Sequence, residues 1–404
     1  MNAATSREGS LDLQARRGVA LTAVQQRGVS SSTLLLFASI VFMVRAVSLM
    51  LGPLLVALAD DFGTSITAPL VGPISDTYGR RPVLLIGVLL MALGVLGSGV
   101  AWSYSSLLAL RLITGIGSAM ILPTIMAALA DDLPPEKLGK AVGFITSSSW
   151  VGVAVGVPAI ALLGYIGGWR LPFYITGGLS LAVWVPLWLW LPSGQRRPSQ
   201  RIDIFNRFKV IGRQSAPWYV FIANATQQMA LFGLMTYFAA HMMESYGWDE
   251  ASTAPGLALL GVGAVIGSFA GGFIAGQARR LDWLAAISLA GGVVAGLLFA
   301  LGASAWIVVA MAFVASVLVS VSMPVLLTLI MHLAGQSRGT AGGMLSTSNQ
   351  FGSFVGASAG GLMLSLGGFP AVGLLCLVGT VLSASVVGLG MRRSPAFQLG
   401  GAGK

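Results

Sequence analysis

The chain has 404 residues, of which 55% are hydrophobic and only 9% are charged, whereas about a quarter of a soluble globular protein is charged. This composition excludes a soluble protein. Long apolar runs between short charged clusters indicate membrane-spanning helices, since about 20 apolar residues cross a hydrocarbon core of ~30 Å. The single cysteine, Cys376, excludes an intrachain disulfide, and the net charge of +10 follows membrane topology rather than nucleic-acid binding.

Apolar runs follow one another along the chain and predict an all-α membrane protein. In the first part they cover Thr33–Leu58, a short remnant at Ile66–Ser75, Pro82–Ala101, Ser105–Ala130, Gly139–Ile166 and Leu171–Leu191. In the second part they cover Trp218–Met243, Ala254–Gly276, Trp283–Leu301, Trp306–Ala334, Gly339–Leu366 and Pro370–Leu389. The full runs are far longer than the ~10 residues that a strand of a membrane barrel needs, so we expect helices throughout.

The basic residues predict the orientation in the membrane. They gather in alternate loops, including Arg80, Arg81 and the segment 192–217, whereas the opposite loops contain acids such as Asp60 and Glu244. Positive charge marks the cytoplasmic side, and the polar start of the chain does not read as a cleaved signal peptide. We therefore predict a cytoplasmic tail at 1–32, a transmembrane bundle at 33–191, a basic cytoplasmic linker at 192–217, a second bundle at 218–389 and a cytoplasmic tail at 390–404.

The second half of the chain repeats the first. Gly143, Gly152 and Gly156 align with Gly343, Gly352 and Gly356, each 200 residues further along, and Arg80 aligns with Arg280. The same register exposes a deficit, because 25 residues separate Gly247 from Gly272 but only 9 separate Gly63 from Gly72. The helix of ~15 Å left at Ile66–Ser75 is too short to cross the membrane. The repeat predicts two six-helix bundles in which helix 2 is truncated.

A loop motif follows the remnant, with Gly72, Asp76, Gly79, Arg80 and Arg81 in the segment GPISDTYGRR. Asp76 can pair with Arg80 or accept hydrogen bonds from the amides of a helix N-terminus. The segment resembles the signature loop between helices 2 and 3 of the major facilitator superfamily. The resemblance implies the fold of that family over about 33–389 and a conformational latch at this loop, while a topogenic arginine pair is the alternative. In the second half, glycine replaces the acid, so a matching latch is doubtful there.

Two arginines lie within spans, where a charge is costly and usually faces a cavity or a partner. Arg111, in the segment LRLITGIG, resembles the fourth-helix motif of the family, which implies a part in proton coupling; the alternative is snorkelling to the outer surface. Arg45 lies near the middle of the first span, and no Asp or Glu within a confident span neutralises it. Two cavity cations would suit an anionic substrate, and a structural role for Arg45 is the alternative.

Glycines four residues apart form ridges on which helices pack closely. In the fifth span, Gly143, Gly152, Gly156 and Pro158 resemble the antiporter motif of the family, which favours export. Further ridges stand in the eighth span at Gly263, Gly267 and Gly271, and in the eleventh at Gly352, Gly356 and Gly360. In the family, helix 5 packs on helix 8 and helix 2 on helix 11, so we expect the eleventh ridge to face a partner that is largely missing. Packing without a coupling role is the alternative.

Polar and aromatic residues within the spans form a candidate cavity lining: Trp150, Gln227, Gln228, Tyr237, His332, Asn349 and Gln350. The sequence contains no nucleotide-binding loop, no metal-ligand spacing and no nucleophile beside a base. We therefore expect no cofactor, no metal and no enzymatic activity.

These patterns predict a monomeric, multi-pass protein of a bacterial inner membrane, with both termini cytoplasmic. It would export a small organic compound by alternating access in exchange for protons. The expected partners are the substrate, protons and the lipid bilayer, without nucleic acid. Two alternatives stay open: uptake of an organic anion held by Arg45 and Arg111, and a non-transporting or defective protein, because helix 2 is shortened.

Overall fold

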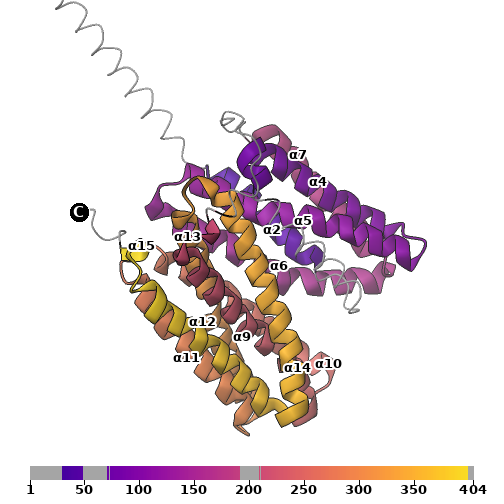
Figure 1. The fold of residues 1–404 in the computed structure, drawn as a ribbon. Coiled ribbons are helices and arrows are strands. Elements are labelled where there is room, and N and C mark those ends of the chain that lie inside the picture. The colour runs from indigo at the N-terminus through magenta and orange to yellow at the C-terminus, as the bar shows by residue number, and fades with distance from the viewer. Residues whose placement is uncertain (1–29, 49–70, 72, 192–208, 210, 399–404) are drawn as a thin grey trace, which may run out of the picture.

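The computed structural model describes residues 30–48, 71, 73–191, 209 and 211–398, and these residues form helices joined by short connections. In the first half the helices are α2 (Ser31–Ser48), α4 (Arg80–Gly99), α5 (Tyr104–Asp132), α6 (Pro135–Gly167) and α7 (Leu171–Trp190). Their described bounds lie within a few residues of the predicted spans, except at the end of the first span, and Figure 1 shows how the helices are arranged. The end of the first predicted span and most of the remnant Ile66–Ser75 lie outside the described residues.

The second half contains α9 (Ser215–Tyr246), α10 (Glu250–Ile274), α11 (Arg280–Ala300), α12 (Ala305–Ser320), α13 (Ser322–Leu333) and α14 (Arg338–Ser385), followed by a π-helical turn at Val386–Met391 and α15 (Pro395–Gln398). The predicted span Trp306–Ala334 is divided into α12 and α13 at Val321. The two last predicted spans are joined in α14, where only Gly367 and Gly368 leave the helical conformation. A positive φ of 67° at Gly368 allows this sharp reversal without a longer loop.

Local chemistry sets several helix ends. Ser103 and Ser106 form a reciprocal capping box at the start of α5, and the Asp249 side chain accepts a hydrogen bond of 2.8 Å from the Ser252 amide at the start of α10. Gly247, with a φ of 67°, ends α9 in the left-handed conformation that favours glycine. These caps satisfy backbone groups that a helix end otherwise leaves without partners.

The helices present an apolar outer surface, as expected for contact with lipid. Large side chains such as Trp102, Leu366 and Phe354 are 84%, 72% and 65% exposed, and exposed apolar surface on this scale is unusual for a soluble monomer. Among the described residues, eight helical stretches are long and apolar enough to cross a membrane. α9 has 32 residues and also exceeds the required length, although its buried face includes Asn224, Gln227 and Gln228.

The helices gather into two groups, α2–α7 and α9–α14, which lie side by side in Figure 1. Within the groups, α4 packs on α5 and α7, and α9 packs on α14. Between the groups, α6 packs on α10, and α5 packs on α14. These two helix pairs position the contacts that join the halves.

Candidate functional site

The loop motif begins with a short helical turn at 73–78 that Gly79 separates from α4. Gly79 has a φ of 95°, a conformation that a residue with a Cβ rarely adopts. This turn brings Asp76 and Arg80 together. The Arg80 guanidinium donates a hydrogen bond of 2.6 Å to Asp76 Oδ1 and one of 2.9 Å to Ser75 Oγ.

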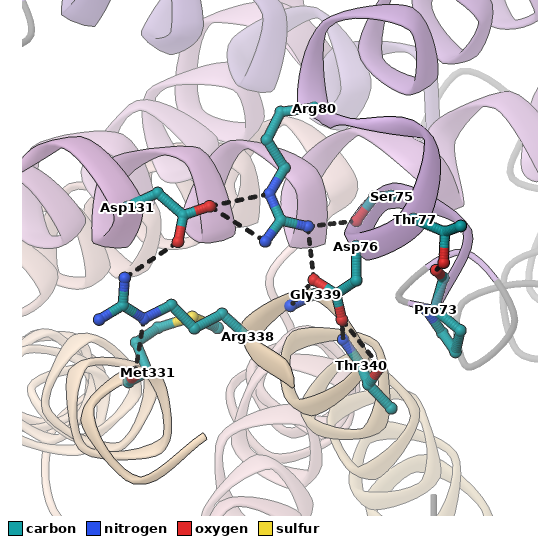
Figure 2. Close-up of polar contacts among 10 residues, drawn as sticks. All are labelled: Pro73, Ser75, Asp76, Thr77, Arg80, Asp131, Met331, Arg338, Gly339 and Thr340. Carbon is teal, nitrogen blue, oxygen red and sulfur yellow. Dashed lines mark hydrogen bonds and ion pairs between the residues drawn. The ribbon is translucent and has the colours of Figure 1, made fainter. Parts of the chain in front are cut away.

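The Asp76 carboxylate also reaches the other half of the molecule, as Figure 2 shows. The Gly339 amide donates to Oδ1 at 3.0 Å, and the Thr340 amide and hydroxyl donate to Oδ2 at 3.1 and 3.0 Å. These residues form the first turn of α14, where a negative charge is stabilised by free amides and the helix dipole. Because the Asp76 side chain is 0% exposed, these bonds are shielded from competing water. Asp76 thus caps a helix of the opposite half.

Asp131, at the end of α5, forms a second bridge between the halves. It accepts a hydrogen bond of 3.1 Å from Arg80 Nε and one of 3.0 Å from an Arg338 amino group. Arg338 also donates to the carbonyls of Ala130 and Met331. The Asp131 side chain is 22% exposed, so these pairs stabilise the contact less than the buried Asp76 bonds do. We call Ser75, Asp76, Arg80, Asp131, Arg338 and Thr340, with the Gly339 amide, the cross-half network.

Some of the predicted latch residues belong to the cross-half network, and others do not. Asp76, Gly79 and Arg80 form the turn and the network, whereas Arg81 points to α7 and donates a hydrogen bond of 2.6 Å to the Trp188 carbonyl. Gly72 lies outside the described residues. In the second half, Arg280 donates weakly to the Ala275 carbonyl at 3.4 Å, in a segment where Gly276 replaces the acid.

Sequence reasoning missed Asp131, Arg338 and Thr340 as members of the site. The signals were present as an acid at the end of the fourth span and as Arg-Gly-Thr at the start of the eleventh. Neither signal names its partner, because the two residues of the Asp131–Arg338 pair stand 207 positions apart.

Two glycines bring α6 and α10 into backbone contact between the halves. A Cβ built on Gly143 would lie 2.6 Å from the Gly272 Cα, and one built on Gly272 would lie 2.7 Å from the Gly143 Cα. Gly152 instead faces α2, where its Cβ would meet the Phe42 carbonyl oxygen at 2.6 Å. Gly156 is buried in α6, which also contains Pro158. The contact of helix 5 with helix 8 that the resemblance implies is therefore present.

The other two glycine ridges face helices of their own half. Gly263, Gly267 and Gly271 approach the backbone carbonyls of Phe313, Val317 and Val321. Gly352, Gly356 and Gly360 approach Ala225, Met229 and Tyr237 of α9. The expectation that the eleventh ridge faces the missing part of helix 2 is therefore wrong. Helical spacing identifies a ridge but not the helix that packs on it.

Trp150 of α6 inserts its indole into the second half. It is 8% exposed and packs in one cluster with Leu231 of α9, Ala264 of α10 and Val319 of α12. The large aromatic ring of Trp150 is therefore almost fully buried where the two halves meet.

Replacing Trp150 by alanine should lower the free energy of unfolding by about 3–5 kcal/mol, because it removes a buried aromatic ring and leaves a cavity. The midpoint of thermal unfolding in detergent measures this loss. The matched control is Trp102→Ala, because Trp102 is 84% exposed and should shift the midpoint little. Equal shifts for the two variants would contradict a joining role for Trp150.

The remaining predicted lining residues lie in different surroundings. Gln227 donates to the Val319 carbonyl at 3.2 Å, and Tyr237 donates to the Ala357 carbonyl. Gln228 is buried, His332 and Gln350 are half-buried, and Asn349 is 6% exposed. Asn349 lines a small cavity between the halves, and a role of these residues in binding substrate stays a prediction.

The two arginines within spans lie on different helices, Arg111 on α5 and Arg45 on α2. Arg111 is 1% exposed, and its guanidinium lies 4.7 Å from the ring centroid of Phe173 in α7, the geometry of a cation–π contact. Arg45 lies in the last turn of α2, with its Cβ next to Gly152. Their part in proton coupling or substrate binding also stays a prediction.

Comparison with known proteins agrees with this architecture. The sequence profile of the Major Facilitator Superfamily matches residues 19–335. The chain is 27% identical over 307 residues to the putative transporter AraJ of Escherichia coli K12, covering 76% of this chain and 77% of that protein. It is 25% identical over 312 residues to multidrug resistance protein 1 of Bacillus subtilis 168, covering 74% and 77%.

A solved structure supports the same fold. The human organic anion transporter MFSD10 superposes with a TM-score of 0.77 at 17% identity, covering 87% of this chain and 97% of that one. Because the profile spans most of a chain that is helical, apolar on its surface and joined across its halves at the loop motif, this multi-pass membrane protein belongs to the Major Facilitator Superfamily.

Proposed function

We propose that the chain is a secondary transporter that exports a small organic compound from a bacterial cell in exchange for protons. It would work as a monomer in the inner membrane, with both termini and the 192–217 linker in the cytoplasm. The observation that carries the proposal is the cross-half network, in which Asp76 caps α14 with bonds of 3.0–3.1 Å. Such bonds hold only while the two halves touch at this end.

The network fits a cycle of alternating access. While Asp76, Arg80 and Arg338 are joined, the halves are closed on the side of the network, which is the cytoplasmic side in the proposed orientation. Opening on this side requires that the bonds break, so the network favours one of two states without blocking the other. Sliding along the Gly143–Gly272 contact would allow the halves to tilt, because glycines leave no side chains in the path.

Two observations favour export over uptake. The glycines and Pro158 of α6 resemble the antiporter motif, and a relative with 25% identity is a multidrug resistance protein. The proton gradient would supply the energy.

Efflux from a bacterium that lacks its own drug pumps tests the proposal. Cells are loaded with fluorescent compounds that are uncharged, cationic or anionic, and the loss of each compound is followed with and without an uncoupler. We expect the chain to speed the loss of at least one compound, and the uncoupler to stop this gain. Accumulation of an anion instead would establish uptake and overturn export.

The shortened second helix predicts an effect of its own. Inserting about 16 apolar residues after Ser65 restores the spacing of the second half and gives the segment the ~20 residues that a crossing needs. We expect the restored chain to export at least about 10-fold faster than the chain as it stands, because a complete helix satisfies its backbone amides within the membrane.

The matched control for this insertion has 16 glycines and serines at the same place. If both insertions leave the rate unchanged while the chain exports, the short crossing does not limit transport. If no version exports although all reach the membrane, a role other than transport replaces the proposal.

A further inference from the structure

A small cavity lies between the halves, deeper in the membrane than the cross-half network. It has a volume of about 20 Å³, which is space for about one water molecule. Its lining includes Pro123 and Met126 of α5 in the first half, and Asn224, Met323, Ser346 and Asn349 in the second half. Gly342 closes one wall, because a Cβ built on it would lie 3.5 Å from Pro123.

The cavity lies near the middle of the membrane. Asn349 stands 11 residues after Arg338 at the start of α14, and a rise of 1.5 Å per residue places it about 16 Å along the helix. Pro123 stands eight residues before Asp131 on α5, about 12 Å from the network. Both residues therefore lie at roughly half of the ~30 Å hydrocarbon thickness.

One amide in this lining has an unused acceptor. Asn349 is 6% exposed, and its Oδ1 accepts no hydrogen bond from the part of the chain that the structure describes. Asn224, by contrast, donates a hydrogen bond of 2.9 Å to Ser348 Oγ. A buried polar atom without a partner is costly. A bound molecule that donates a hydrogen bond to Asn349 Oδ1 therefore gains binding free energy at this position.

The lining also defines the class of molecule. None of the ten described residues that line the cavity is charged, and most of them are apolar. An organic anion would lose its hydration here without meeting a cation. Met126 and Met323 have flexible side chains that adapt to varied shapes. The chemistry suits an uncharged, mainly apolar molecule with one hydroxyl or amide donor.

We propose that Asn349 is a specificity-determining residue that selects such donors. The inference rests on the proposed function, since opening of the network would part α5 from α14 and widen this cavity into the entry for substrate. Asn349 Oδ1 then accepts the hydrogen bond of the substrate, and the apolar walls hold its body.

Equilibrium binding to the purified full chain in lipid nanodiscs tests this assignment. The probes are 2-naphthalenemethanol, its methyl ether and 2-naphthoate, which share one ring system and differ in donor and charge. We expect the alcohol to bind about 10-fold more tightly than the ether, and the naphthoate to bind most weakly. In Asn349→Leu the alcohol should bind only as tightly as the ether.

Two further variants complete the test. Asn349→Ala should lose the same preference for the alcohol, and it serves as the test if Asn349→Leu disturbs the fold. Ser358→Leu, on the exposed face of α14, should keep the preference. A preference for the alcohol that survives in both Asn349 variants overturns the proposal, as does preferential binding of the naphthoate or binding of none of the probes.

Efflux of the same probes separates this inference from the proposed function. A donor preference that depends on Asn349 without gradient-driven efflux supports the binding assignment and contradicts export. Efflux of the alcohol and the ether at rates that do not depend on Asn349 supports export and contradicts the assignment.

Discussion

Asp76→Asn should release the halves on the side of the network and slow transport at least about 10-fold. The change keeps the size of the side chain but removes its charge, so the pair with Arg80 is lost and one carboxylate oxygen that faces Gly339 or Thr340 becomes an NH2 group. Of the Asp76 bonds, only those to Gly339 and Thr340 join the halves, and loss of such buried, charge-assisted bonds costs ~2–4 kcal/mol. That cost shifts the balance between closed and open states by roughly 30- to 700-fold.

Cysteine labelling can follow this release directly. The single native cysteine is buried and is first replaced in Cys376→Ser, after which Ser346→Cys introduces a reporter into the lining of the cavity between the halves. Maleimide should label the reporter at least about 10-fold faster in Asp76→Asn than in the parent, because the cavity opens more often.

The matched control removes an acid of the second half. Asp282 pairs with Arg279 and Arg392, and its side chain is 45% exposed, so Asp282→Asn should change neither labelling nor transport measurably. Equal labelling rates in Asp76→Asn and in the parent would show that the cross-half network does not hold the closed state.

Gly143→Ala should impair transport as strongly, through packing rather than charge. Its methyl group would lie 2.6 Å from the Gly272 Cα, so α6 and α10 must move apart. Overpacking of this kind costs ~1–3 kcal/mol, and the methyl group also obstructs sliding between the halves. We expect an export rate at least about 10-fold lower, with a reduced midpoint of thermal unfolding.

The reciprocal variant sharpens this prediction. Gly272→Ala meets the same backbone at 2.7 Å and should have the same effect, whereas the double variant should cost less than the two single variants together, because the first methyl group has already separated the helices. Gly178→Ala is the control, since its Cβ would meet nothing within 4 Å, and alanine favours a helix over glycine. Full activity in Gly143→Ala would show that transport does not depend on the close Gly143–Gly272 contact.

Much of the fold could be predicted from the sequence, because the membrane imposes the length and apolar character of each span. The predicted span Pro82–Ala101 corresponds to α4 at Arg80–Gly99, and the predicted span Leu171–Leu191 corresponds to α7 at Leu171–Trp190. The joining of the last two spans into α14 could not be foreseen, since Gly367-Gly368 reads equally well as an ordinary loop. The conformation of these two glycines depends on how the flanking helices meet.

The site was foreseen in part. The pairing of Asp76 with Arg80 follows from a spacing of four residues and is local. The capping of α14 by Asp76 and the bridge through Asp131 involve residues more than 200 positions apart, and no local pattern encodes which helix end meets which loop. From the sequence alone, Arg338 is only a basic residue that precedes the predicted span Gly339–Leu366.

The cross-half network lies at one end of α14, which is long enough to act as a lever. Its middle is fixed to α9, where Gly352 and Gly356 meet the carbonyls of Ala225 and Met229. From Arg338 to Leu366 the helix measures about 43 Å at 1.5 Å per residue, so a tilt of 10° about the middle displaces each tip by roughly 4 Å in opposite directions. In the proposed cycle, a displacement of that size would break the bonds of Asp76 to Gly339 and Thr340 at one tip, while the other tip would move in the opposite direction. If α14 tilts as one rigid body, opening on the two sides of the membrane would be mutually exclusive in the proposed cycle.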